Sequence, residues 1–389
     1  MSKEKLIILF TVAIDVIGLG IIIPIMPIYV ESFGVTAFVV TTIFTTYALF
    51  TFLSAPFLGA LSDKIGRRPV LLVSILSTSI GWFVFASAGS LFFLFLGRII
   101  DGLAAGNFST AQSAISDLSK DQKERTVNLG LVGAVFGVGF IVGPLIGGLL
   151  TKVSTSFPFY FVGCLALFNF ILAYFFLPET NKHINKDKVI VWNPLRPVFQ
   201  ATKDLKMRKL YLVWLLFNIV AVGTNSIFAL YLLSVFGFGA LGTGLFFTGV
   251  GLVLVLNQGV LLKKVWLKYF SEKSLIIIML SAFVLGFVIM AFPFLIMFIL
   301  GMFFVSFGQS TLRVLITSEV TREASLDERG KVIGILSGIG SVASIIGPLL
   351  AGALFGYEVF IPFAFSAIIS IVAIIIISER KFPVKISNN

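Results

Sequence analysis

Three ionisable side chains lie inside long apolar segments of this chain, where charge is costly. Asp15 lies near the middle of the first segment, and Arg98 and Asp101 lie about one helical turn apart in the fourth. An ionised side chain at membrane depth costs about 2.5 to 3.5 kcal/mol on insertion scales, so each indicates a partner or a water-filled cavity. The chemistry open to such a carboxyl is the binding and release of a proton.

Arg98 and Asp101 are three residues apart, so we expect them to pair. Asp15 has no basic residue within four positions in the sequence, and a low-dielectric site favours the neutral form of a carboxyl. We therefore expect Asp15 to bind the driving proton, with Asp101 as the alternative, and Arg98 to modulate it. A structural interpretation stays open, in which Asp15 is a fixed hydrogen-bond acceptor near Gly18 and the other two form a static pair.

A second concentration of charge is GALSDKIGRRPV, from Gly59 to Val70, which separates two apolar runs. We expect Gly59 to permit close helix approach, Asp63 to cap or face a helix N-terminus, and Gly66 to form a left-handed turn. The two arginines offer bidentate partners to a nearby acid. The alternative is a basic turn that contains glycine by chance. The candidate gating residues are Gly59, Asp63, Gly66, Arg67, Arg68 and Asp117.

Glycine and proline recur in two later apolar segments and predict flat surfaces against which another helix packs closely. Proline removes one helical hydrogen bond and bends the helix. These helices are candidates for the surface along which two halves pivot, with ordinary small-residue packing as the alternative. The candidate hinge residues are Gly133, Gly137, Gly143, Pro144, Gly147, Gly347 and Pro348.

The elements that position these residues are membrane-spanning helices. Of 389 residues, 58% are hydrophobic and only 12% are charged, whereas a soluble domain carries about 25% charged residues. Apolar segments of about 20 residues recur, long enough to cross a hydrocarbon core of about 30 Å. The sequence predicts an all-α polytopic protein with twelve spans: Leu6–Ile28, Thr41–Leu61, Val70–Ser87, Leu91–Ile115, Leu129–Leu150, Phe157–Leu177, Leu210–Leu233, Leu241–Leu262, Ser274–Met290, Phe292–Leu315, Val332–Phe355 and Phe360–Ser378.

The basic residues follow the predicted topology. If both termini are cytoplasmic, seven successive basic stretches lie inside and only Lys152 lies outside, as the positive-inside rule requires. The net charge of +11 therefore reflects orientation in a lipid bilayer. Nucleic acid is not an expected partner, because the basic residues do not form one patch with interleaved aromatics. The single histidine, His183, cannot build a metal site.

The chain divides into two similar halves. The polar stretch from residue 178 to 209 separates the spans six and six, so we expect bundles at 1–177 and 210–389 joined by a cytoplasmic linker. A shift of 204 positions aligns Gly143-Pro144-Leu145 with Gly347-Pro348-Leu349. Such repeats are typical of transporters with a site between the halves. The linker from Asn193 is expected to form an amphipathic helix on the inner membrane face.

The repeat is not complete at the gating turn. The equivalent loop in the second half, LKKVWLKYFSEKS from Leu262 to Ser274, lacks the Gly-Asp-Gly pattern. We therefore expect a gating cluster in the first half alone. Arg313 and Glu319, near the inner end of the tenth span, are expected to be interfacial anchors.

Four stretches resemble the major facilitator superfamily. GALSDKIGRRPV is similar to its signature loop between helices two and three, and LGRIIDGLAAGN resembles its helix-four arginine signature. GAVFGVGFIVGPLIGGLL is similar to the antiporter signature of helix five, and AIDVIGLGIIIPIMPIY to helix one of tetracycline exporters. The resemblance implies two pseudo-symmetric six-helix bundles, and within the superfamily the twelve-span drug/proton antiporters of the bacterial inner membrane.

The resemblance implies proton-coupled export of a small amphipathic or lipophilic compound, such as tetracycline or varied drugs, by alternating access. The alternative is transport of a polar metabolite: a sugar, nucleoside, amino acid or siderophore. We expect no enzyme and no cofactor, and the lack of a GxxxxGK[ST] loop disfavours ATP as the energy source. With both halves on one chain, a monomer is expected. The candidate substrate-cavity residues are Asn107, Gln112, Asn218, Asn225, Gln258 and Gln309, and Asn257 belongs to the same set of uncharged polar groups.

Overall fold

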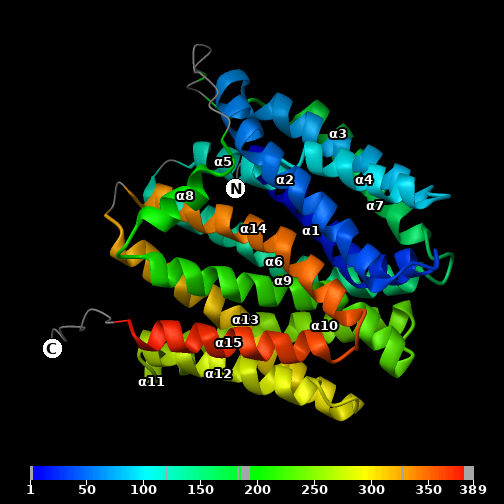
Figure 1. The fold of residues 1–389 in the computed structure, drawn as a ribbon. Coiled ribbons are helices and arrows are strands. Elements are labelled where there is room, and N and C mark those ends of the chain that lie inside the picture. The colour runs from blue at the N-terminus through cyan, green and yellow to red at the C-terminus, as the bar shows by residue number, and fades with distance from the viewer. Residues whose placement is uncertain (1–2, 120, 182–183, 185–192, 326–327, 381–389) are drawn as a thin grey trace. The chain divides into compact units, whose positions relative to one another are not determined.

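The computed structural model describes residues 3–119, 121–181, 184, 193–325 and 328–380, and within these ranges it is helical without strands (Figure 1). The helices are α1 (Lys3–Glu31), α2 (Ala37–Ile65), α3 (Arg67–Ala86), α4 (Leu91–Leu103), α5 (Asn107–Asp117), α6 (Gln122–Leu150), α7 (Phe157–Phe176), α8 (Arg196–Lys203), α9 (Arg208–Phe236), α10 (Ala240–Leu256), a π-helical segment (Asn257–Trp266), α11 (Leu267–Tyr269), α12 (Glu272–Met290), α13 (Leu295–Glu323), α14 (Arg329–Phe355) and α15 (Ile361–Ser378). The predicted all-α polytopic fold is confirmed.

The described residues contain eleven helices that are long and apolar enough to cross a membrane. The fourth expected span, Leu91–Ile115, is not one helix but two, α4 and α5. Gly102 and Gly106 flank the break, and the Gly106 amide donates to the Ala104 carbonyl (2.7 Å) in place of a helical bond. Two glycines weaken the helix there, and α5 is rich in Ser, Thr, Asn and Gln.

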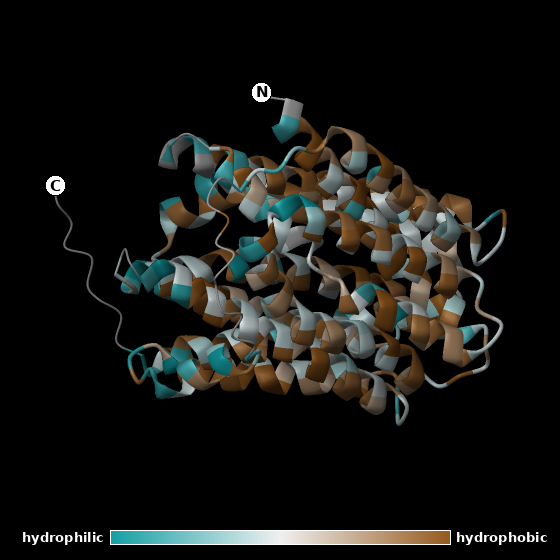
Figure 2. Ribbon diagram, turned by 90° about the horizontal axis from the view of Figure 1, so that it is seen from above, coloured by the Kyte–Doolittle hydropathy of each residue, from teal (hydrophilic) through white to brown (hydrophobic). Residues whose placement is uncertain are grey.

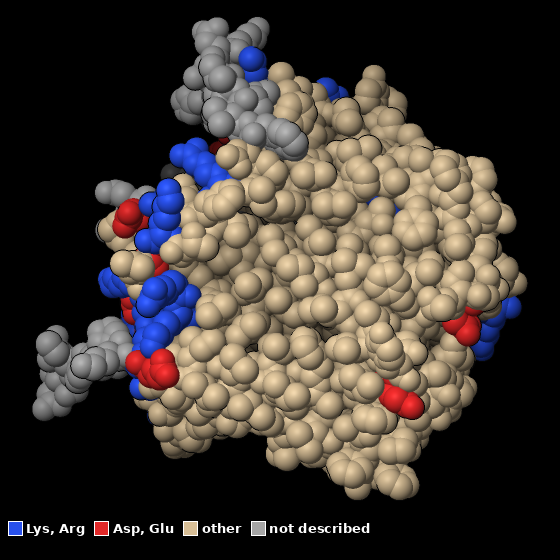
Figure 3. All heavy atoms as spheres, viewed as in Figure 1, with Lys and Arg blue, Asp and Glu red and all other residues tan. Residues whose placement is uncertain are grey.

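The helices carry hydrophobic residues along most of their length, and hydrophilic residues gather mainly near helix ends (Figure 2). On the face that Figure 3 shows, most of the surface is uncharged, and most Lys and Arg side chains lie at its margins. Many large apolar side chains are exposed, among them Phe92, Phe175 and Ile296. These are the features of helices whose sides contact lipid and whose ends contact water. The protein is a multi-pass membrane protein.

The contacts between residues divide the chain into two compact units. The first comprises Met1–Pro194, Asn225–Leu252 and Ala351–Gly356, and the second comprises Leu195–Thr224, Val253–Leu350 and Tyr357–Asn389. In the first unit α1 packs on α6 and α7, and α3 packs on α4 and α7. In the second unit α12 contacts both α13 and α15 (Figure 1). The expected division at residues 177 and 209 stays a prediction.

Paired glycines join equivalent helices in each unit. In the first unit a Cβ at Gly97 of α4 would lie 2.7 Å from the Gly81 carbonyl oxygen of α3. In the second unit a Cβ at Gly286 of α12 would lie 2.7 Å from the Gly301 carbonyl oxygen of α13. Neither position has room for a side chain, so the backbones approach closely. The internal repeat is therefore visible in the packing of each unit.

Candidate functional site

Arg98 and Asp101 form a buried ion pair in α4. Their exposed fractions are 3% and 5%, and the Arg98 Nη1 donates to Asp101 Oδ2 at 3.1 Å. The side chain of Thr78 also hydrogen-bonds Asp101. The Nε and Nη2 atoms of Arg98 have no hydrogen-bond partner among the described residues. The guanidinium is thus only partly satisfied by hydrogen bonds.

Aromatic rings cover the rest of this guanidinium. The Arg98 Cζ lies 3.4 Å from the ring centre of Trp82, 4.9 Å from that of Phe85 and 5.8 Å from that of Tyr47. A desolvated cation–π contact contributes about 2 kcal/mol or more. Trp82 is itself fixed by a stacked contact with Phe159 at 5.9 Å. Sequence analysis missed Trp82, because an aromatic residue in an apolar span indicates packing until a cation is placed beside it.

Asp15 belongs to the same unit and the same electrostatic neighbourhood. It lies half-buried on α1, and Tyr47 of α2 interacts electrostatically with Asp15, Arg98 and Asp101. Tyr47 is therefore within electrostatic range of all three residues predicted for proton coupling, and their coupling role stays a prediction. Tyr47 is the fourth residue of this group, and sequence analysis missed it. A single tyrosine among Thr and Phe residues forms no pattern with the three charged residues in the sequence.

Small residues on α2 and α3 hold α4 in place beside this site. Ser54 Oγ donates to the Gly102 carbonyl (2.8 Å) and Ser77 Oγ to the Ile100 carbonyl (2.6 Å). A Cβ at Gly81 would lie 3.0 Å from the Cβ of Asp101. These contacts fix the carboxylate against α3 and place the α4–α5 break directly after it.

A second group of charges lies at the turn between α2 and α3. The Arg67 Nη1 pairs with Asp63 Oδ1 at 2.5 Å and also donates to Ser62 Oγ at 2.6 Å. The Arg67 Nε donates to Asp117 Oδ2 at 3.2 Å. One arginine thereby joins the end of α2, the start of α3 and the end of α5. We use the name first-half charge cluster for four residues: Asp63, Arg67, Asp117 and Glu179. The contacts of Glu179 are described in the next paragraph.

The turn is shorter than expected from the spans at Thr41–Leu61 and Val70–Ser87. Both helices extend to Gly66, whose φ of 105° is outside helical geometry. Glu179 caps α3, because it accepts from the amides of Arg67 (2.9 Å) and Arg68 (3.1 Å). Asp63 faces the start of the same helix through its pair with Arg67, as the sequence led us to expect. A Cβ at Gly66 would collide with this carboxylate.

Glu179 was missed in the sequence analysis, although an acid so soon after the sixth span is a recognisable signal. The Arg68 Nη2 donates to the Tyr174 carbonyl at 2.6 Å. The expected close helix approach at Gly59 is wrong within the described residues, since no atom lies within 4 Å of its added Cβ.

The second unit has a charge cluster at the equivalent helix ends, so the expectation of a cluster in the first half alone is wrong. The Arg322 Nη1 donates to Glu272 Oε2 (2.5 Å), and its Nη2 donates to both carboxylate oxygens of Glu319 (2.7 and 2.6 Å). Arg380, after α15, pairs with Glu323. The second-half charge cluster consists of these five residues: Glu272, Glu319, Arg322, Glu323 and Arg380.

The side chain of Glu319 is fully buried, with an exposed fraction of 0%. It is therefore not the interfacial anchor that the sequence led us to expect.

The two clusters have reversed polarity. A shift of 204 residues moves Arg67 to the position before Glu272 and moves Asp117 to the position before Arg322. The first half thus joins a base at the start of α3 to an acid at the end of α5. The second half joins an acid at the start of α12 to a base near the end of α13. The Gly-Asp-Gly pattern could not predict this equivalence, because the acid and the base exchange places between the two halves.

The hinge candidates of the first half pack against α1. A Cβ at Gly143 would lie 2.7 Å from Gly20 Cα, and one at Gly147 would lie 3.1 Å from Ile21. Pro144 lies inside α6, as does Gly137, whereas open space surrounds an added Cβ at Gly133. Close packing is therefore confined to the C-terminal part of the helix.

In the second unit the equivalent pair is α9 with α14. A Cβ at Gly223 would lie 2.7 Å from the Gly347 carbonyl oxygen, and Pro348 follows within α14. The close contact between α1 and α6 thus recurs between α9 and α14, which are the equivalent helices under the 204-residue shift of the repeat.

The first unit also holds a contact between α6 and the N-terminal part of α10. A Cβ at Gly244 would collide with the Pro144 carbonyl oxygen, and one at Gly251 would lie 2.8 Å from that of Phe140. Thr248 Oγ1 donates to the Ile141 carbonyl at 3.2 Å. Two helices from different sequence halves therefore pack backbone to backbone here.

The substrate-cavity candidates are divided between the two units, and their role stays a prediction. Gln112 and Asn225 belong to the first unit, and Asn218, Gln258 and Gln309 to the second. Asn218 is buried and bonds the Trp214 carbonyl of its own helix (2.8 Å), while Gln258 is exposed and donates to the Ser310 carbonyl (3.3 Å). The side chain of Asn107 lies outside the described part of the structure.

Asn257 is the most extensively bonded of these polar residues. It is fully buried at the start of the π-helical segment. Its Nδ2 donates to Ser310 Oγ (2.5 Å) and Thr311 Oγ1 (2.8 Å), and its Oδ1 accepts from Trp266 Nε1 (2.7 Å). Because its bonds are all internal to the second unit, Asn257 fixes the π-helical segment to α13.

Comparisons with known proteins agree with this architecture. The family model of the Major Facilitator Superfamily matches residues 8–325 and 261–387. The chain is 31% identical to the tetracycline resistance protein, class H, of Pasteurella multocida, over 92% of this chain and 90% of the relative. It is 27% identical to the quinolone resistance protein NorA of Staphylococcus aureus (strain MRSA252), over 98% of this chain and 97% of the relative.

Solved structures show the same fold. The nucleoside transporter NupG superimposes with a TM-score of 0.79 at 14% identity, over 98% of this chain and all of the other. At that identity the likeness concerns the fold alone. The family match covers both halves and the identity to the first relative holds over nearly the whole length. The chain therefore belongs to the Major Facilitator Superfamily, a family of transporters and not of enzymes.

Proposed function

We propose that this protein is a proton-driven antiporter that exports a small amphipathic or lipophilic drug, of the tetracycline or quinolone type, by alternating access. Its relatives named for tetracycline and quinolone resistance support drug export over transport of a polar metabolite. The observation that carries the proton coupling is the buried Arg98–Asp101 pair with Asp15 in reach of the same tyrosine.

The proton is exchanged at the carboxyls of this group. Asp15 is the primary acceptor, because it is half-buried on α1 and interacts electrostatically with Tyr47, which also interacts with Arg98 and Asp101. Protonation of either carboxyl changes the charge around Arg98, whose guanidinium keeps two unbonded nitrogens for a new partner. A change of net charge in a low-dielectric site is a large electrostatic perturbation. Such a perturbation biases the equilibrium between two access states.

The glycine contacts supply the surfaces for this conformational change. We propose that α6 and α14 are pivot helices, and that the two charge clusters hold the ends of each half together while it moves as a rigid body. The protein acts as a monomer in a bacterial inner membrane with both termini cytoplasmic. Residues 1–177 and 210–389 form its two bundles, joined by the linker 178–209. The basic stretches support this orientation.

The proposal is tested in everted membrane vesicles with an imposed pH gradient, by fluorescence of a ΔpH-sensitive dye when tetracycline or a fluoroquinolone is added. Asp15→Asn is expected to abolish drug-dependent proton movement while leaving expression unchanged. Asp101→Asn is expected to reduce it at least tenfold. Glu358→Gln, which neutralises an exposed acid between α14 and α15, is the matched control. Full coupling in Asp15→Asn would contradict the assigned proton role.

A further inference from the structure

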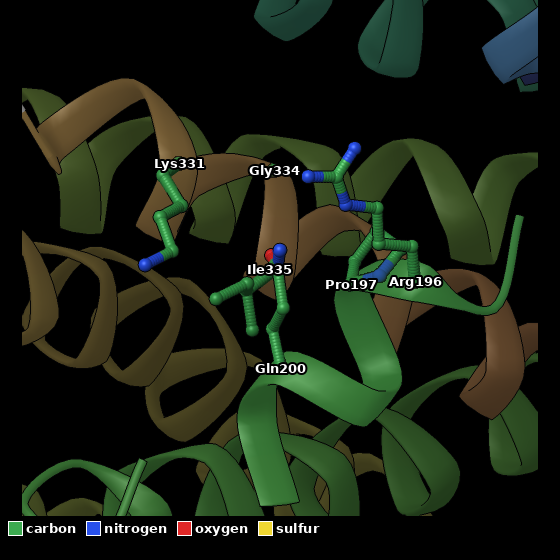
Figure 4. A pocket seen from close by; sticks show the side chains of 6 residues that line it. All are labelled: Arg196, Pro197, Gln200, Lys331, Gly334 and Ile335. Carbon is green, nitrogen blue, oxygen red and sulfur yellow. The ribbon is translucent and has the colours of Figure 1, made fainter. Parts of the chain in front are cut away.

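A concave site lies between the linker helix α8 and the start of α14 in the second unit. It has a volume of about 510 Å³ and is lined by Arg196, Pro197, Gln200, Lys331, Gly334 and Ile335. Figure 4 shows that the first three come from α8 and the others from α14, with the Gln200 amide between the two basic side chains in that view. The proton-coupling residues do not line it.

The charges of this site are unbalanced. None of its six lining residues is acidic. Within the described chain Arg196 makes no ion pair, and Lys331 has only a 3.9 Å contact with Glu328, with both side chains more than half exposed. Exposed pairs of this kind contribute about 0 to 1 kcal/mol. Two cations from different helices therefore face one hollow with little compensation.

Open space at one position and close packing at another define the shape of the site. Gly334 leaves open space, since no atom lies within 4 Å of an added Cβ there. Pro197 packs closely on Gly338, where an added Cβ would lie 2.9 Å from its Cβ, and this contact fixes α8 to α14. Pro197 and Ile335 supply an apolar wall beside the cations. The hollow thus combines a fixed frame, a basic rim and an apolar surface.

Its surroundings point to the membrane surface. The amphipathic α8 exposes Phe199, with Leu195 exposed just before it, while Arg196 and Lys203 are polar neighbours on the same short segment. A helix of this composition lies in the bilayer interface. Basic pockets at the cytoplasmic face bind anionic lipid headgroups, since that leaflet is negatively charged.

We propose that this site binds a phosphate ester anion, the headgroup phosphate of an anionic phospholipid in the inner leaflet. The Arg196 guanidinium has the planar fork that matches two phosphate oxygens. Lys331 supplies a second cation and Gln200 an amide donor. The apolar wall contacts the glycerol and the first acyl carbons. The lipid would hold α8, and with it the linker, on the start of α14.

Native mass spectrometry of the purified full chain measures this binding without reference to transport. The protein is titrated with phosphatidylglycerol, with phosphatidylcholine and with inorganic phosphate as separate arms. We expect phosphatidylglycerol to bind in preference to phosphatidylcholine. Arg196→Gln and Lys331→Gln should each weaken it about fivefold, as expected for removal of one basic contact at a lipid surface. Lys203→Gln, on α8 but outside the lining, should leave binding unchanged.

Gly334→Leu fills the hollow without changing charge, and it is expected to remove the bound phosphatidylglycerol even if a charge variant fails to fold. Retention of the lipid in Gly334→Leu would overturn the proposed position. Equal binding of phosphatidylcholine would overturn the headgroup assignment. Displacement of the lipid by millimolar inorganic phosphate would identify a free phosphate site and overturn the lipid as occupant.

Discussion

At the scale of single residues, the environment of Arg98 is the feature that distinguishes this chain from a simple bundle of apolar helices. One of its nitrogens bonds Asp101, and a tryptophan ring lies 3.4 Å from its Cζ. A buried guanidinium without such contacts would carry a large desolvation cost. The aromatic contact therefore stabilises the charged group and leaves two nitrogens without a fixed hydrogen bond.

Replacement of Trp82 tests this contact. Trp82→Leu is expected to lower stability by about 2 kcal/mol or more, the value of a desolvated cation–π contact, whereas Trp82→Phe keeps an aromatic face and should lose less. Thermal unfolding in detergent measures both. Phe92→Leu, at an exposed aromatic of α4, is the control. A Trp82→Leu protein as stable as the wild type would show that the ring does not support the cation.

At the scale of elements, α3 begins with its first amides bonded to a distant carboxylate. Glu179, which follows α7 in the chain, accepts from Arg67 and Arg68 across more than 100 residues of sequence. This bond fixes the turn at Gly66 and, through Arg67, the ends of α2 and α5. The cap therefore joins four helices at one point.

Loss of this cap should loosen the start of α3. Glu179→Ala is expected to cost about 0.5 to 2 kcal/mol, as for other N-terminal caps. Hydrogen exchange followed by mass spectrometry should then be faster in the peptide that contains Arg67 and Arg68. The exposed Glu358→Ala is the matched variant. Unchanged exchange at α3 would contradict the capping role.

The glycines of α6 offer a comparison within one helix. Gly143→Ala places a Cβ 2.7 Å from Gly20 Cα and should lower the melting temperature. Gly133→Ala enters open space, where alanine is favoured over glycine by about 1 kcal/mol in a helix, and should be neutral or stabilising. Equal effects of the two substitutions would show that α1 and α6 do not depend on this contact.

The elements also show what the sequence could and could not predict. Eleven spans and the pair of Arg98 with Asp101 follow from hydropathy and from helical spacing. The break between α4 and α5 did not, because Gly102 and Gly106 are also compatible with a continuous membrane helix. Trp82 and Tyr47 were missed because their roles arise from contacts between distant segments, which periodicity along one segment does not report. The second-half cluster was missed because its charges are exchanged.

At the scale of the whole molecule, each sequence half contains one charge cluster that joins the ends of equivalent helices. The acid and the base of the joining ion pair are exchanged between the two halves. The repeat therefore conserves the positions of these contacts while exchanging acid and base. Arg322→Ala is expected to cost about 1 to 3 kcal/mol, since it leaves the buried Glu319 without its donor, whereas the exposed Arg329→Ala should be neutral. Unfolding in detergent compares them, and equal stability would contradict a structural role for the second cluster.

The central claim is that drug export and proton movement are one coupled reaction. The direct measurement is proton flux in proteoliposomes of the purified wild-type protein, with an internal pH indicator, when tetracycline is added under an imposed pH gradient. The account predicts drug-dependent proton flux that is opposite in direction to drug movement and is lost in Asp15→Asn. Drug accumulation that proceeds at the same rate with no pH gradient and no proton flux would contradict it.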